Sequence, residues 1–158
     1  MPQVRESGGA RVIVDDRHIP VVIYLWSGAT TVELASWHMA ENERICAELV
    51  ARKQKFVLVS DASASDRPSP AVRKVFAEAV ERTPDSHGEF TLGNIVVISS
   101  PLMRGAMTAL SWVTTKMAKM DTVATMQEGL ERALGELDAA GVPRPEGLDP
   151  ANYCPPTL

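Results

Sequence analysis

The hydrophobic positions of the chain form short, almost continuous runs that alternate with longer stretches of helical spacing. Three runs are of the first kind: residues 21–26 (VVIYLW), 55–60 (KFVLVS) and 94–99 (NIVVIS). Strands that are apolar on both faces are typical of a parallel sheet with helices on both sides. A weaker run at 121–124 indicates one more strand of this sheet.

The first of these strands belongs to a predicted hairpin. Residues 11–26 contain two β-rich runs, separated by a turn at Asp15, Asp16, Arg17 and His18. Short runs of this kind around a polar turn favour two antiparallel strands. Residues 1–9 are polar and contain paired glycines, and we interpret them as a flexible leader.

Each predicted helix begins at a side chain that can cap it. Ser or Thr at the cap accepts a hydrogen bond from a free backbone N–H, and proline suits the first helical position. The first helix extends to about Arg52 and the last to about Gly141. Four such starts are present: Thr30 with Glu33, Ser69 with Pro70, Ser100 with Pro101, and Thr125 with Glu128.

This alternation predicts an α/β fold. A single domain over 10–141 would hold a mixed, mostly parallel sheet of about five strands, with an N-terminal hairpin and about four helices. Residues 142–158 contain five prolines (Pro143, Pro145, Pro150, Pro155 and Pro156). This composition favours an extended tail over packed structure.

Charge and composition narrow the function classes. The 158 residues carry 16 basic and 20 acidic side chains, a net charge of −4, which is the wrong sign for binding a nucleic-acid backbone. Two cysteines, Cys46 and Cys154, do not make a disulfide framework. The longest apolar runs are too short for a membrane-spanning helix, and we expect a cytoplasmic protein.

Motifs for catalysis, metals and cofactors are missing from the sequence. The three histidines, His18, His38 and His87, have no ligand spacing, and neither phosphate-binding glycine motif is present. Asp15, Asp16 and His18 could converge, but turns are commonly built from such residues. We therefore predict no metal, no cofactor and no catalytic residue.

Several isolated positions remain candidates for contacts. His38 and Asn42 fall within the apolar arc of the first long helix, either hydrogen-bonded at the rim of the core or lining a pocket. Arg104 follows Ser100 in the first turn of another helix, where a cation opposes the helix dipole. It is either an anion or partner contact or an exposed arginine. Trp37 and Trp112 lie off the apolar arcs of their helices and could form a homodimer surface.

Four phrases together resemble the STAS domain, the family of sulfate-transporter and anti-sigma-factor-antagonist domains. WSGATTVEL is similar to the family's second strand and first helix, and FVLVSDAS to its strand ending in Asp-x-Ser, here Asp61 and Ser63. GNIVVISSPLMRGAM resembles the entry to the third helix, and DTVATMQEGLERAL the last strand and helix. The resemblance covers about residues 11–140 and implies a STAS-like fold.

One phrase departs from the family pattern. Antagonist members have Asp-Ser-Ser-Gly at the entry to the second helix, and a partner kinase phosphorylates that serine. Here the entry reads Ser69-Pro70-Ala71-Val72, which puts the usual phosphoserine switch in doubt. The chain looks closer to divergent bacterial STAS-like domains that also resemble CRAL-TRIO-type lipid-exchange proteins, for which the resemblance implies no catalytic residues.

We therefore expect a non-enzymatic regulatory domain that binds a protein partner. The expected contact surface, with its candidate phosphoacceptors, is the loop that contains Asp61, Ser63, Ser65, Asp66 and Ser69. A binding protein for a lipid or anionic metabolite is the alternative, with a pocket near His38, Asn42, Ser100 and Arg104. An enzyme of unrecognised class is the third hypothesis.

Overall fold

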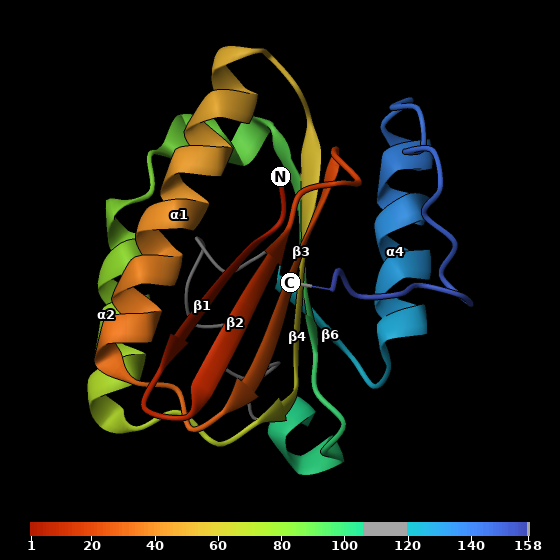
Figure 1. Cartoon of the computed structure of the whole chain (residues 1–158). Coiled ribbons are helices and arrows are strands. Elements are labelled where there is room, and N and C mark those ends of the chain that lie inside the picture. The colour runs from red at the N-terminus through yellow and green to blue at the C-terminus, as the bar shows by residue number, and fades with distance from the viewer. Residues whose placement is uncertain (106–119, 158) are drawn as a thin grey trace.

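A mixed six-stranded sheet forms the centre of the fold (Figure 1). The computed structural model describes residues 1–105 and 120–157. Neighbouring strands follow the chain order, antiparallel from β1 to β3 and parallel from β3 to β6. This arrangement confirms the expected mixed, mostly parallel sheet with an N-terminal hairpin. The strands are β1 (Gln3–Ser7), β2 (Ala10–Asp15), β3 (Val21–Gly28), β4 (Phe56–Ser65), β5 (Thr91–Val97) and β6 (Met120–Val123).

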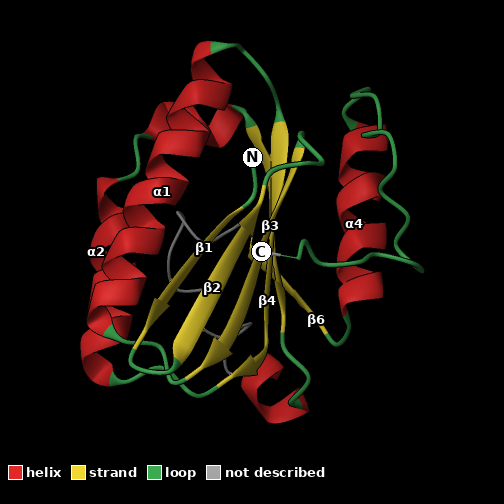
Figure 2. Cartoon of the chain, in the orientation of Figure 1, coloured by secondary structure: helices red, strands yellow, loops and turns green. Residues whose placement is uncertain are grey.

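Helices cover both faces of the sheet (Figure 2). Helices α1 (Val32–Ala51) and α2 (Pro70–Arg82) lie on one face, and α4 (Met126–Ala139) lies on the other. A short 3-10 helix, η1 (Asp85–Glu89), precedes β5. Residues 101–105 are also helical, so each of the four predicted helices has helical residues at its expected place.

Alternate residues of β3 supply two separate cores. Val22 and Tyr24 pack with the apolar residues of α1, whereas Val21 and Ile23 pack with those of α4. All four side chains are buried. Successive side chains of a strand point to opposite faces, so an apolar run with no polar alternation requires cover on both sides.

Side-chain caps fix where the helices begin. Ser69 Oγ accepts from Val72 N at 3.3 Å, and Thr125 Oγ1 accepts from Glu128 N at 3.2 Å. The predicted cap of α1 is wrong by one residue, because Thr31 Oγ1 accepts from Leu34 N at 3.1 Å. Glu33 does not close a capping box there; its carboxylate accepts from Ser7 Oγ at 3.1 Å instead.

The N-terminal residues belong to the sheet, which corrects the prediction of a flexible leader at 1–9. Ser7 pairs with Ala10 across the two glycines between them. Gly8 and Gly9 have φ of 59° and 83°, the left-handed backbone that a two-residue hairpin turn requires. The paired glycines that suggested a loose segment therefore form a tight turn, and β1 becomes the edge strand.

The C-terminal residues lie against the domain, which corrects the expectation of an unpacked tail at 142–158. Residues 142–157 contain no helix or strand, in keeping with their prolines. Leu148 is nevertheless buried in the core beneath α4, and Val142 and Tyr153 pack against that core. Residues 142–157 are called the tail below.

Candidate functional site

The end of β4 projects beyond the neighbouring strand. β4 pairs with β3 as far as Ser65 opposite Gly28, but it pairs with β5 only as far as Asp61 opposite Val97. Within the described residues, no strand pairs with Ala62–Ser65 on the side of β5. We call residues 61–69 the β4–α2 surface. It lies at the carboxyl ends of parallel strands, where open α/β sheets commonly bind their ligands.

This geometry changes the expected loop. A turn-forming composition predicts a loop from Asp61 onward, but the residues from Asp61 to Ser65 continue β4. The reason is that β3 also extends to Gly28 and supplies a partner for them, with an irregularity between Leu25 and Ser27. Asp66 N then donates to Gly28 O at 3.0 Å, which holds the chain against β3 one residue further.

The carboxylate of Asp61 accepts hydrogen bonds from Ser63 on the part of β4 that has no described strand partner on the side of β5. Its Oδ1 accepts from Ser63 N at 2.9 Å and also from Ser63 Oγ. Asp61 is half-buried and Ser63 is exposed. A self-capped edge of this kind keeps its polar groups satisfied while the surface has no partner.

The remaining serines of the β4–α2 surface have different environments. Ser65 is half-buried, and its hydroxyl donates to Ala62 O at 2.9 Å. Ser69 is exposed and caps α2. Asp66 is exposed as well. The structure therefore brings Asp61, Ser63, Ser65, Asp66 and Ser69 together along one continuous segment, as their sequence order required.

His38 and Asn42 belong to α1 and contact the side chains beneath this helix. His38 is buried between two aromatic rings, with ring centroids 4.6 Å from Tyr24 and 4.5 Å from Trp26. Its Nδ1 makes no hydrogen bond with the described residues, and burial lowers its pKa to about 3. Asn42 Oδ1 accepts from the Tyr24 hydroxyl at 2.8 Å. His38 is therefore a buried core residue, and the half-buried Asn42 is bonded to the core tyrosine.

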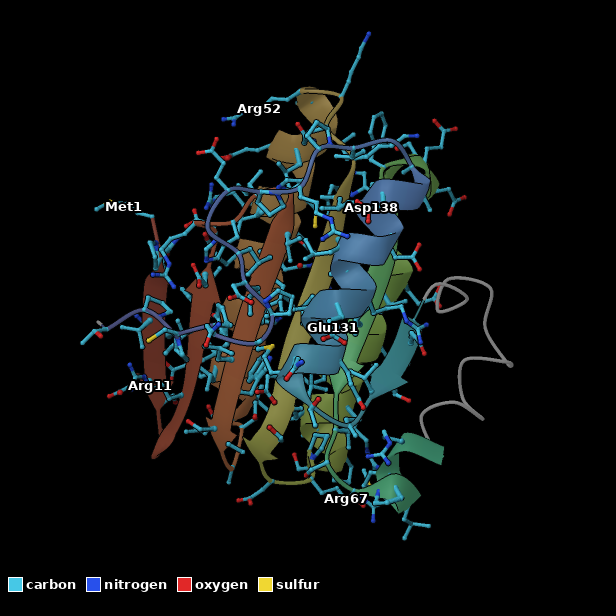
Figure 3. The ribbon with its side chains drawn as sticks, turned by 90° about the vertical axis from the view of Figure 1, so that its right-hand side faces the viewer. Met1, Arg11, Arg52, Arg67, Glu131 and Asp138 are labelled. Carbon is cyan, nitrogen blue, oxygen red and sulfur yellow. The ribbon has the colours of Figure 1, made fainter. Side chains whose placement is uncertain are left out.

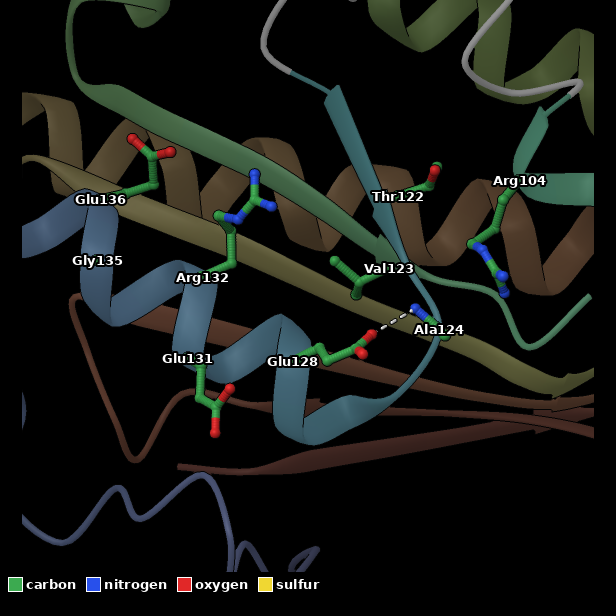
Figure 4. A pocket seen from close by; sticks show the side chains of 9 residues that line it. All are labelled: Arg104, Thr122, Val123, Ala124, Glu128, Glu131, Arg132, Gly135 and Glu136. Carbon is green, nitrogen blue, oxygen red and sulfur yellow. Dashed lines mark hydrogen bonds between the residues drawn. The ribbon is translucent and has the colours of Figure 1, made fainter. Parts of the chain in front are cut away.

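Arg104 lines a groove of about 760 Å³ beside α4 and β6 (Figure 4). Its Nη1 donates to Ile98 O at 2.7 Å and to Ser99 O at 2.9 Å. Arg132 pairs with Asp121 in the same region. The groove is also lined by three carboxylates, from Glu128, Glu131 and Glu136. Ser100 lies next to it in the chain, where its hydroxyl accepts from Met103 N at 3.4 Å.

The residues of the expected ligand pocket do not lie together in the structure. His38 and Asn42 belong to the core beneath α1, whereas Arg104 lines a groove beside α4, on the other face of the sheet. Neither His38 nor Asn42 lines that groove or the smaller groove beside Arg44. Trp37 is half-buried against the α1 core, and Trp112 lies outside the described residues.

The cluster of Asp15, Arg17 and Tyr153 could not be predicted from the sequence. Asp15 is fully buried, and its carboxylate binds Arg17 and the hydroxyl of Tyr153, 138 residues away in the chain. The turn residues were visible in the sequence, but nothing in their spacing pointed to a tyrosine in the tail.

Comparisons with known proteins identify the architecture. No protein-family model matches the chain, and no curated protein matches it. Among solved structures, an uncharacterized protein of the DUF3478 family from Shewanella loihica PV-4, described as having a SpoIIAA-like fold, is similar with a TM-score of 0.55. The two sequences are 13% identical, over 84% of this chain and 92% of that one. The fold is SpoIIAA-like.

That finding confirms the expected STAS-like fold. An anti-sigma factor antagonist from Mycobacterium paratuberculosis is also similar, at 18% identity over 79% of this chain and 94% of that one, with a TM-score of 0.46. Likeness at such identities establishes the fold alone. The activity has to be argued from the residues of this chain.

The described residues give no sign of a metal centre or a membrane span. They contain no cluster of three or more histidine, cysteine, aspartate or glutamate side chains that could hold a metal ion. None of their helices has the length and apolar character needed to cross a bilayer. Cys46 is buried among apolar neighbours, and burial raises the pKa of its thiol to about 12, so it is not a ready nucleophile.

Proposed function

We propose that the chain is a non-enzymatic regulatory domain that binds a protein partner through the β4–α2 surface. The observation that carries the proposal is the projecting end of β4. No described strand pairs with Ala62–Ser65 on the side of β5, and the hydroxyl of Ser63 next to them is exposed. A partner strand could add to this edge by replacing the local bonds of Ser63 N to Asp61 and of Ser65 Oγ to Ala62 O.

The fold supports the same surface. STAS domains, which this chain resembles, regulate through protein contacts, and the antagonist members have their phosphorylated serine at the entry to the second helix. In this chain the matching position is Pro70 or Ala71, and the nearby serine is Ser69, the cap of α2. The contact and the entry to α2 therefore form one continuous surface.

Phosphorylation of Ser69 would give this surface a switch. The first turn of α2 contains no acidic side chain, and a phosphate at its N-terminus would meet the positive end of the helix dipole. Ser65 is the weaker candidate, because its hydroxyl is already bonded to Ala62 O in a half-buried position. We propose Ser69 as the phosphoacceptor.

A small-ligand function receives less support. The Arg104 groove presents three carboxylates, and Arg132, one of its two arginines, is paired with Asp121. These charges oppose the binding of an anionic metabolite. No comparable observation supports a catalytic role, because no described cavity contains a nucleophile, a base and an oxyanion site together.

Site-specific crosslinking tests the proposed contact. A photoreactive amino acid at Ser63 is expected to capture one discrete protein in cells of the native organism. The same amino acid at Glu131, exposed on α4, is the matched control and should capture none of it. With the purified partner, Ser63→Arg should weaken binding by about tenfold or more, the cost of a charge without a partner in an interface. The proposal would be refuted if the partner were captured from Glu131 as well and bound the Ser63→Arg variant with unchanged affinity.

A separate measurement tests the switch. Intact-mass and peptide analysis of the protein from its native cells should find phosphate on Ser69. Ser69→Asp should then change the affinity for the captured partner, whereas Ser69→Thr should not. Absence of phosphate together with equal affinities would remove the switch and leave the contact intact.

A further inference from the structure

The tail lies on the same face of the sheet as α4. Helix α4 packs on β4, β5 and β6. From the end of α4 the tail turns back and crosses the same face toward the β1 edge (Figure 3). Leu148 and Tyr153 pack on the core that contains Val21 and Ile23 of β3. A segment without regular secondary structure thus completes the cover of a core to which α4 also contributes.

The far end of the tail is fastened to a buried carboxylate. Asp15 is 0% exposed. Arg17 donates to it from Nε and Nη2, each at 2.8 Å, and the Tyr153 hydroxyl donates to its Oδ2 at 3.0 Å. Arg17 Nη2 also donates to Cys154 O at 3.0 Å. One carboxylate and one guanidinium therefore join the turn after β2 to the tail, and both are charged, which makes these hydrogen bonds stronger than neutral ones.

The other described side-chain contacts of the tail add packing but few strong hydrogen bonds to the rest of the domain. The ring of His18 meets that of Tyr153 edge-on, with centroids 6.2 Å apart. Near the start of the tail, Arg144 pairs with Asp138 of α4, but both side chains are about half exposed, and such surface pairs contribute little. Asp149 and Asn152 bond to each other within the tail. Asp15 is accordingly the main polar anchor.

We propose that residues 142–157 are a detachable strap, latched at Asp15, that opens without unfolding the domain and uncovers the part of the core on which Leu148 and Tyr153 pack. The strap shares no strand ladder with the sheet, so its release breaks a few side-chain contacts and leaves every strand pair intact. Segments with few backbone hydrogen bonds and a small apolar contact open at lower free energy than the core.

A strap of this kind would control access to one face of the sheet. While it is closed, Val21 and Ile23 are fully buried. This part of the core therefore becomes accessible only after the latch at Asp15 has opened. This device is independent of the β4–α2 surface, because it involves β2, β3 and the tail.

Hydrogen exchange on the full-length protein, followed by mass spectrometry, tests the strap. In the wild type, peptides from 142–157 should exchange faster than peptides from β4 under native conditions. Tyr153→Phe keeps the ring and removes the hydroxyl that bonds to Asp15. Because hydrogen bonds to charged groups are among the stronger ones, strap exchange should accelerate by about tenfold or more, while exchange of β4 stays unchanged.

Tyr24→Phe is the matched control. It deletes the same atom at a buried site beneath α1, where the hydroxyl bonds to Asn42 at 2.8 Å. It should not accelerate exchange of the strap relative to β4. Leu148→Ala, which weakens the apolar contact of the strap, should act like Tyr153→Phe and increase binding of a hydrophobic dye.

Two results would overturn the proposal. The first is strap exchange at the rate of β4 in the wild type and all variants, which would mean that the strap opens only with global unfolding. The second is equal acceleration of the strap by Tyr24→Phe and Tyr153→Phe, which would mean that the effect is a general loss of stability.

Discussion

His38 lies in an environment that favours its neutral form. Burial between Tyr24 and Trp26 lowers its pKa to about 3, against 6.5 in an unfolded chain. As the pH falls through 6.5, the unfolded chain takes up a proton that the folded protein does not. The unfolding free energy therefore decreases as the pH falls from 6.5 toward 3, by about 1.4 kcal/mol per pH unit at most.

Urea unfolding at pH 7.5 and pH 5.0 measures this effect. His38 alone should reduce the unfolding free energy by about 2 kcal/mol between these two conditions. His38→Phe, which keeps an aromatic ring in the site, should show a pH difference smaller by that amount. Carboxylates titrate equally in both proteins, so the comparison isolates His38. An unchanged pH difference in the variant would mean that His38 is protonated in the folded state.

Ser69 has a structural role that has to be separated from its proposed regulatory one. Its hydroxyl caps α2 by accepting from Val72 N. Ser69→Ala should lower the unfolding free energy by about 1 kcal/mol, whereas Ser69→Asp should retain the cap and the stability. Chemical denaturation measures both. Equal stability of Ser69→Ala and the wild type would show that the cap contributes nothing, and the serine would then be available for partner contact alone.

At the scale of elements, the turn between β1 and β2 depends on a close backbone approach at the end of β3. Gly28 has φ of 76°, and a Cβ there would lie 2.9 Å from Gly9 O and 3.2 Å from the Cα of Ala10. Backbone atoms cannot rotate away as side chains can. Gly28→Ala should therefore lower the unfolding free energy by about 2 kcal/mol or more.

Gly135 gives the matched comparison for Gly28. It lies in the interior of α4, is exposed, and a Cβ there would meet nothing within 4 Å. Gly135→Ala should raise the unfolding free energy by about 0.5–1 kcal/mol, because alanine favours helix more than glycine does. Thermal unfolding of the two variants should thus shift in opposite directions. A stabilising Gly28→Ala would show that the β1–β2 turn can move away from β3.

The order of these elements could be predicted because local patterns determine it. The apolar run of β3, the Ser69–Pro70 start of α2 and the Thr125 cap of α4 each depend on neighbouring residues. The misassigned segments depend on distant partners instead. Ala62–Ser65 are strand because β3 pairs with them, and Gln3–Ser7 are strand because β2 and α1 hold them. No pattern within either segment carries that information.

At the scale of the whole molecule, a candidate site could be predicted from the sequence only where its residues are consecutive in the chain. The β4–α2 surface could be predicted because residues 61–69 are consecutive. The ligand pocket expected from His38 and Arg104 could be predicted only by knowing which face of the sheet each helix covers. The structure places the two residues on opposite faces. The Asp15–Tyr153 latch joins residues far apart in the sequence, through a tail whose prolines suggested no packing.

The two cores share the strands between them, which predicts a single cooperative unit. Leu34 of α1 and Leu130 of α4 are both 0% exposed and lie on opposite faces of the sheet. Because adjacent residues of β3 serve both cores, loss of either core should release the same strands. Leu34→Ala and Leu130→Ala should each lower the unfolding free energy by about 3 kcal/mol, with the same dependence on urea concentration as the wild type.

Tryptophan fluorescence and far-ultraviolet circular dichroism should give coincident urea transitions for both variants. Trp26 reports on the core beneath α1, whereas circular dichroism averages over all helices, so coincidence requires the two faces to unfold together. Val32→Ala is the control for Leu34→Ala, since Val32 is 45% exposed on the same helix and its truncation should change stability by less than about 0.5 kcal/mol. If Leu130→Ala separated the two transitions, α4 and its core would unfold independently, and the strands would not couple the faces.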